Sequence, residues 1–143
     1  MVSDRRPTDP VRTDDSADMA MAVLARETRS ASVARSWLRG FLDGAGLPEP
    51  VQADAALVIS ELVTNALRHG LGEIVARAKI GDDGHVDVSV TDSGAEQPQL
   101  QEVDPERVGG VGLHVVAQVS DEWGVAQFPG GKTVWARIAL AGR

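Results

Sequence analysis

The sequence predicts an α+β fold, a two-layer sandwich in which about three helices cover one face of a mostly antiparallel sheet. Two long segments repeat apolar residues at intervals of three and four, the period of helices with one buried face. Other segments alternate apolar and polar residues and are joined in pairs by short turns, which is typical of hairpins. No glycine-rich strand–helix–strand unit comes early in the chain and no GxxxxGK[ST] run occurs, so a dinucleotide fold and a Walker-type site are disfavoured.

The composition predicts one domain preceded by a tail. Residues 1–18 carry Pro7, Pro10, many charges and few apolar side chains, so we expect a disordered tail and a single domain over 19–143. No apolar run approaches the roughly 18 residues needed to cross a bilayer, and no export signal is present, which predicts a cytoplasmic protein without membrane contact. The chain has no cysteine, which excludes disulfides and thiolate zinc sites. A net charge of −7 with 3% aromatic residues argues against a nucleic-acid binder and favours a protein partner or small ligand.

The first elements follow from spacing and from helix-ending residues. Residues 19–26 fit a strand, although their alanines and methionines suit a helix equally well. A first amphipathic helix is expected from a cap at Thr28 or Ser30 to the glycines at 44–46. A second runs over 51–69 and is ended by Gly70 and Gly72.

The second half of the chain predicts two hairpins, a loop and a third helix. The first hairpin pairs two alternating segments across a GDDG turn, and the second closes around a Pro-Gly-Gly turn. Between them lies a segment rich in Gln, Glu and Pro, of about the length of a lid. In order, the expected elements are strands 74–80 and 85–91, the loop 95–108, a helix 113–119 opened by the glycines of 109–112, and strands 121–128 and 133–140.

The segment 61–70, ELVTNALRHG, carries the first candidate site residues. At 100° per residue, Glu61 and Asn65 lie on one stripe at the border of the apolar helix face, with Arg68 just outside it. A carboxylate and a carboxamide placed there can bind a hard cation or hold a water against a phosphate. A solvated helix flank accounts for the same pattern.

Two glycine-bearing sites follow. Asp92 ends a strand, and a buried carboxylate there could accept a hydrogen bond from an exocyclic amine such as that of adenine, while Gly94 lets backbone approach a flat ligand. An ordinary Asp-Ser-Gly turn is the alternative. The run 109–112 before an apolar helix offers free amides and a positive helix end to phosphates, and a loop hinge is the alternative there.

In this order, ELVTNALRHG, DSG, GGVGLHVV and GGKTVW resemble the asparagine box and the three glycine boxes of the Bergerat-type ATP-binding fold. Gyrase, MutL and the catalytic domains of histidine kinases share that fold. The resemblance covers about residues 20–140. It is closest to the single-domain anti-sigma-factor serine/threonine kinases, and among them to the ATP-binding regulators of actinobacterial type.

The resemblance implies a role for each site residue. Glu61 would be the general base, Asn65 would ligate magnesium, and Asp92 would bind the adenine amine while Gly94 admits the ring. Arg68 and His69 would contact phosphate or a partner, although His69 fits a packed histidine equally well. The other residues that the resemblance places at the ATP site are Gly110, Val111, Gly112, Leu113, Lys132 and Thr133, with the two glycines at the phosphates and Thr133 near the adenine.

The sequence also departs from the family pattern. Glu96 stands where a second glycine is usual, and Val111 stands where an arginine is common between the glycines of the second box. Lys132 could supply the missing cation, and a solvated hairpin lysine is the alternative. These departures argue against turnover of ATP more than against adenine binding.

The resemblance implies a kinase that uses ATP and magnesium to phosphorylate an anti-anti-sigma protein, sequesters a sigma factor and forms a homodimer. A non-catalytic module in which ATP orders the loop 95–108 and so changes a protein-binding surface is the alternative. A third hypothesis, the catalytic half of a histidine kinase, is weakened because the sequence contains no separate dimerisation and phosphoacceptor helices.

Overall fold

The computed structural model describes residues 10–94 and 108–140, with side chains described from Leu113 onward in the second range. This part of the chain forms strands, helices and short turns in an order close to the predicted one. The elements are β1 (Arg12–Asp15), β2 (Met19–Leu24), α1 (Ser30–Gly44), α2 (Glu49–His69), β3 (Ile74–Ile80), β4 (His85–Asp92), α3 (Val108–Val119), β5 (Glu122–Phe128) and β6 (Gly131–Ala139).

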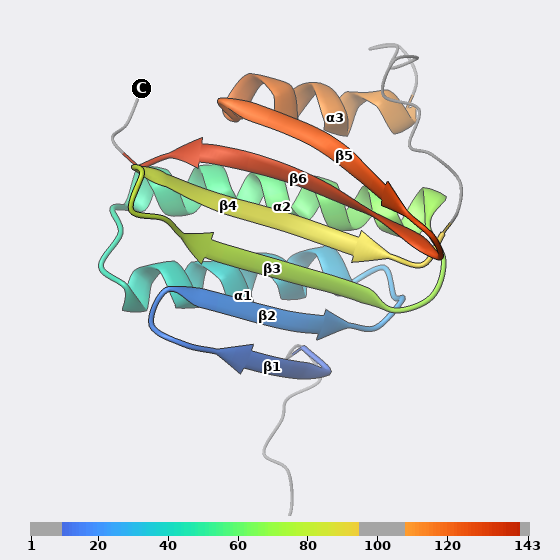
Figure 1. The fold of residues 1–143 in the computed structure, drawn as a ribbon, viewed down its shortest axis with the longest axis horizontal. Helices are drawn as coiled ribbons and strands as arrows, with labels where there is room; N and C mark the ends of the chain where they lie inside the picture. The colour runs from blue at the N-terminus through green and yellow to red at the C-terminus, as the bar shows by residue number, and fades with distance from the viewer. Residues whose placement is uncertain (1–9, 95–107, 141–143) are drawn as a thin grey trace, which may run out of the picture.

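The strands form one six-stranded sheet in the order β1-β2-β3-β4-β6-β5, and every neighbouring pair is antiparallel. Figure 1 shows the helices together on one side of this sheet, with α1 and α2 behind the strands. The predicted fold class, helices on one face of an antiparallel sheet, is confirmed.

The central element of the helix layer is α2. It contacts α1 and α3 on either side and the strands β3, β4 and β6 beneath it. The helix begins at Glu49, two residues before the predicted start, because Pro48 lies at the cap and Pro50 fits the first turn, where a missing N–H costs nothing. It ends at His69, as predicted.

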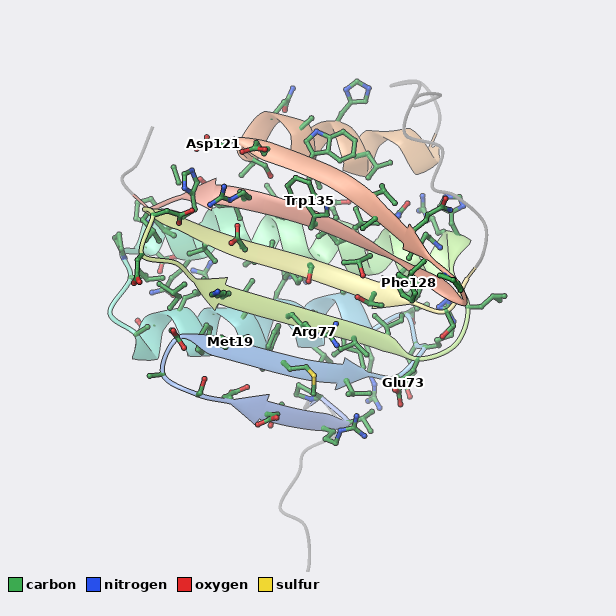
Figure 2. All side chains as sticks on the ribbon, in the orientation of Figure 1. Met19, Glu73, Arg77, Asp121, Phe128 and Trp135 are labelled. Carbon is green, nitrogen blue, oxygen red and sulfur yellow. The ribbon has the colours of Figure 1, made fainter. Side chains whose placement is uncertain are left out.

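Strand alternation separates the two faces of the sheet. The core residues that β4 and β6 contribute face the helices and are Val86, Val88, Val90, Val134, Ala136 and Ile138. Residues of the opposite parity lie on a face without helices, where Figure 2 shows Met19, Arg77 and Trp135. A shallow groove of about 490 Å³ runs over that open face.

The structure corrects the predicted tail. Residues 12–15 form strand β1, which pairs with β2, although we expected disorder as far as residue 18. All of its side chains are exposed, so backbone hydrogen bonds to β2 hold it rather than apolar burial. Composition measures apolar burial and therefore misses such a strand.

Two further differences concern secondary structure at residues 19–26 and 109–112. The ambiguous segment is strand β2, ending at Leu24. The third helix begins at Val108 instead of residue 113, so the glycine run lies inside its first turns rather than before it. Glycine weakens a helix interior by about 0.5–1 kcal/mol but does not forbid it. The rest of the predicted loop, residues 95–107, lies outside the described residues.

No helix in the described ranges is long and apolar enough to span a bilayer.

Candidate functional site

Several of the predicted site residues lie at one end of the sandwich. The last turn of α2, the last residue of β4 and the first residues of β6 meet there, with the start of α3 at the same end (Figure 1). In Figure 2 this end is marked by Glu73 and Phe128, which lie beside the α2–β3 and β5–β6 connections. Antiparallel pairing places Asp92 directly opposite Lys132.

Asp92 and Lys132 form a buried ion pair. Lys132 Nζ donates to Asp92 Oδ1 at 3.0 Å, and the two side chains are 0% and 2% exposed. The backbone N–H of Gly94 donates to the same oxygen at 2.6 Å. A charged pair removed this completely from water is stable only when its geometry and hydrogen bonds are favourable, so these contacts fix the carboxylate.

Three glycines surround Asp92 and make room for it. A Cβ on Gly70 would lie 2.4 Å from Asp92 Cγ, and one on Gly131 would lie 2.4 Å from the Asp92 carbonyl oxygen. A Cβ on Gly94 would lie 2.9 Å from Oδ1. The glycines of three separate segments therefore let the backbone close around Asp92.

Asn65 supplies an unsatisfied polar group at the same end of α2. Its side chain is 6% exposed, and its amide nitrogen makes no hydrogen bond within the described part of the chain. A buried amide without a partner costs roughly 1–3 kcal/mol, which binding of a ligand would recover. Glu61, one turn earlier on the same stripe, is partly exposed. The unpaired amide nitrogen is a donor and fits an acceptor such as a phosphate oxygen. The carboxamide oxygen of Asn65 and the carboxylate of Glu61 are the kinds of ligand that a hard cation such as magnesium takes.

The end of α2 is tied down by Arg26. Its guanidinium donates twice to the carbonyl oxygen of Ala66, at 3.0 and 2.7 Å, and Gly70 N–H donates to the same oxygen at 2.9 Å. A cation at a helix C-terminus also opposes the helix dipole. Asn65, the neighbour of Ala66, is held in place by these contacts.

The remaining predicted residues differ in position. Arg68 is exposed and His69 is partly buried on the last turn of α2, so both reach this end of the molecule. Leu113 is a buried residue of α3. Gly110, Val111 and Gly112 belong to the first turns of α3, and their side-chain environment lies outside the described structure, as does Glu96.

Thr133 is not brought to this site. Its hydroxyl is 2.7 Å from that of Thr91, and Thr133 lines the groove on the open face of the sheet. Successive strand residues point to opposite faces, so Lys132 occupies the inward position instead. The alternative of a solvated Lys132 is also wrong, and its ammonium is held by Asp92 rather than free for a phosphate.

Sequence reasoning missed three contributors: the buried pairing of Lys132, the packing of Gly70 against Asp92, and the cap from Arg26. A signal existed for Lys132, because it shares the parity of the inward residues Val134 and Ala136. Nothing in the local sequence connects Arg26 to Ala66, which is 40 residues away.

Comparisons with known proteins agree with the fold. The family model described as histidine kinase-like ATPase domain matches residues 24–138. The crystal structure of the RsbU and RsbW domains of Rv1364c from Mycobacterium tuberculosis matches with a TM-score of 0.66 and 26% identity, covering 85% of this chain and 32% of that one.

Two structures of the blue-light activated histidine kinase of Erythrobacter litoralis EL346 share the fold. Its histidine kinase domain matches with a TM-score of 0.53 and 20% identity over 78% of this chain and 61% of that chain. The other structure matches with a TM-score of 0.52 and 24% identity over 66% of this chain and 32% of that chain. No curated protein matches. The chain thus spans from one third to three fifths of the solved chains that it resembles.

Proposed function

The chain belongs to the histidine kinase-like ATPase domain family, and from that premise we propose that it is an anti-sigma-factor-type serine/threonine kinase. It phosphorylates an anti-anti-sigma protein and sequesters a sigma factor. The likeness to a structure that contains an RsbW domain, the kind of domain found in anti-sigma-factor kinases, supports this choice within the family. The observation that carries the proposal is the buried Asn65, whose amide nitrogen has no partner among the described residues, near the end of α2 where Gly70 packs against Asp92.

Each site residue has a proposed task. Asp92 accepts a hydrogen bond from the adenine amine. Asn65 would hold magnesium, which would neutralise charge on the phosphates. Glu61 takes the proton from a serine hydroxyl of the partner. The hydroxyl oxygen then bonds to the γ-phosphorus while the bond to the β–γ bridging oxygen breaks, and ADP leaves.

A second function is favoured by the position of Lys132. The Lys132 ammonium is buried against Asp92. It therefore does not replace the phosphate-binding arginine that is common at the position of Val111. A site with fewer phosphate cations binds nucleotide but transfers phosphate poorly. The alternative proposal is therefore a non-catalytic module whose protein-binding surface is gated by ATP.

The finer features stay proposals as well: a single domain after a short tail, a cytoplasmic location and a homodimer. The open face of the sheet, with its groove beside Trp135, is the surface on which to test dimerisation first.

The test is a calorimetric titration with ATP, with and without magnesium, followed by a γ-phosphate transfer assay on a serine-bearing anti-anti-sigma protein. We expect Asn65→Ala to weaken binding at least about tenfold in magnesium and much less without it, because one metal ligand is lost. Glu61→Gln should bind ATP normally but transfer about 100-fold more slowly or worse.

Glu49→Gln is the matched control, since this exposed residue lies at the opposite end of α2. It should leave binding and transfer unchanged. Loss of ATP binding in Glu61→Gln would contradict its role as a base. Normal ATP binding without transfer in the wild type would favour the non-catalytic module, and absence of ATP binding would overturn both proposals.

A further inference from the structure

We propose that Lys132 is a positioning residue for base recognition. It anchors Oδ1 of an ionised Asp92, so that Oδ2 is presented to the exocyclic amine of adenine and purines with a 6-oxo group are rejected. The inference rests on the proposed nucleotide site and specifies how that site selects its base.

The two carboxylate oxygens of Asp92 differ in the hydrogen bonds that they accept. Both hydrogen bonds that Asp92 receives from described residues go to Oδ1, one from Lys132 Nζ and one from Gly94 N–H. An ammonium and an amide N–H are donors only, so Oδ1 acts as an acceptor in both bonds. Among the described residues none donates to Oδ2, and we assign this oxygen to the ligand.

The ammonium of Lys132 balances the charge of the Asp92 carboxylate. Lys132 is fully buried and Asp92 is its ion-pair partner, 3.0 Å away. Without a cation, a buried carboxylate is disfavoured and the group takes up a proton instead. Lys132 thus keeps Asp92 acceptor-only, although it lies too deep to act on the phosphates.

The charge of Asp92 is linked to base specificity. An ionised carboxylate accepts a hydrogen bond from the 6-amino group of adenine, but it repels the 6-oxo group of hypoxanthine or guanine. A protonated carboxyl can donate to that oxo group. The state of Asp92 therefore decides which base fits, and Lys132 decides the state.

The packing at Asp92 holds the carboxylate in one orientation. A Cβ at Gly70 would come within 2.6 Å of either carboxylate oxygen, so the group has little room to turn. Register pairing fixes Lys132 opposite it. Base selection through this carboxylate thus depends on a preformed arrangement.

The experiment compares the dissociation constants of ATP and ITP for the wild type and Lys132→Met. The two bases differ in the group at C6, amino or oxo, and in the hydrogen on N1 that accompanies the oxo form. Methionine preserves length and burial but removes the charge. We expect the wild type to prefer ATP by about 10- to 100-fold, the value of one hydrogen bond to a charged group. Lys132→Met should lose most of that preference, through weaker ATP binding and stronger ITP binding.

The control is Lys79→Met, the same change at the exposed lysine of β3. It should keep the wild-type preference. If Lys132 merely holds the fold together, its replacement weakens ATP and ITP equally and the ratio stays at the wild-type value, which overturns the inference while the proposed function stands. Failure of the wild type to bind ATP overturns the proposed function itself.

A second variant covers the case in which Lys132→Met does not fold. Asp92→Asn combined with Lys132→Met removes both charges, and such double replacements are usually tolerated. Gly94 N–H then holds the amide oxygen, so the amide N–H₂ faces the base and ITP should bind better than ATP. Continued preference for ATP in this variant would overturn the inference.

Discussion

Glycines are needed around Asp92 because the backbone approaches this residue closely. The absent side chain of Gly70 leaves the space that the carboxylate fills, and Gly94 donates its N–H to it. Gly70 has φ −105°, which any residue can adopt, so contact with Asp92 is what requires glycine there.

We expect Gly70→Ala to destabilise the protein by about 1–3 kcal/mol, the usual cost of overpacking, and to weaken ATP binding because Asp92 must move. Gly40→Ala is the matched control in α1, where an added Cβ meets nothing within 4 Å. It should stabilise the helix by about 0.5–1 kcal/mol. Urea unfolding and ATP titration of both variants check this, and changes of the same sign would contradict the packing argument.

At the scale of elements, α2 combines core packing with presentation of the site. Its buried face packs on α1, α3 and the inner strands, while Glu61 and Asn65 lie along the border of that face. At the last turn, the backbone N–H of Gly70 donates to the Ala66 carbonyl oxygen. Arg26, just after β2, supplies the donors for the Ala66 carbonyl from a distant part of the sequence.

Removing that cap should loosen the end of α2. We expect Arg26→Met to lower the free energy of unfolding by about 1.5–3 kcal/mol, as for hydrogen bonds from a charged group, and to speed amide exchange in the last turn. Arg29→Met loses only an exposed ion pair with Glu27, worth about 0–1 kcal/mol. If both variants lose the same free energy of unfolding, the hydrogen bonds to Ala66 stabilise the protein no more than an exposed ion pair does.

At the scale of the whole molecule, the two ends of the sheet differ in role. The end opposite the site carries an exposed charge cluster, in which Arg137 pairs with Asp83, Asp87 and Glu122. Loss of hydration raises the pKa of Asp83, but the hydrogen bond and charge of Arg137, with help from His85, outweigh it, and the net pKa lies below its ordinary value. The same contacts raise the pKa of Arg137, through its hydrogen bonds to Asp87 and Asp83.

A lowered folded-state pKa makes the stabilisation pH-dependent. It is fully present above the pKa of the unfolded carboxyl, about 3.9, and is lost as the pH falls through the lower folded-state value. We therefore expect Arg137→Gln to lower the Tm modestly at pH 7 and to differ less from the wild type below pH of about 3.

The control for this change is Arg77→Gln on β3, whose guanidinium bonds to Thr91 and to no acidic side chain in the described ranges. Its effect on the Tm should not shrink in acid. Arg137→Gln should also bind ATP like the wild type, because the cluster lies at the other end of the strands from Asp92. A change in ATP affinity would mean that the two ends are coupled.

Sequence patterns predicted most of the fold, because periodicity reports which face of an element is buried. The helical spacing of α2 and the alternation of β3 and β4 are local properties, and their bounds were predicted within about two residues. Strand β1 was missed because its side chains are exposed and its sequence carries no apolar pattern. The start of α3 was misplaced because the glycines at 109–112 were interpreted as the segment that opens the helix, whereas they lie within it.

The sequence by itself determined the architecture and the order of the boxes, and hence the family. Only the tertiary structure decided which chemical groups meet: Asp92 with Lys132 across the strand pair β4–β6, Gly70 against Asp92, and Arg26 at Ala66. Such contacts join residues 22 to 40 positions apart, so no local period encodes them. They follow from sheet register and from the docking of α2 on the sheet, which every element of the chain sets together.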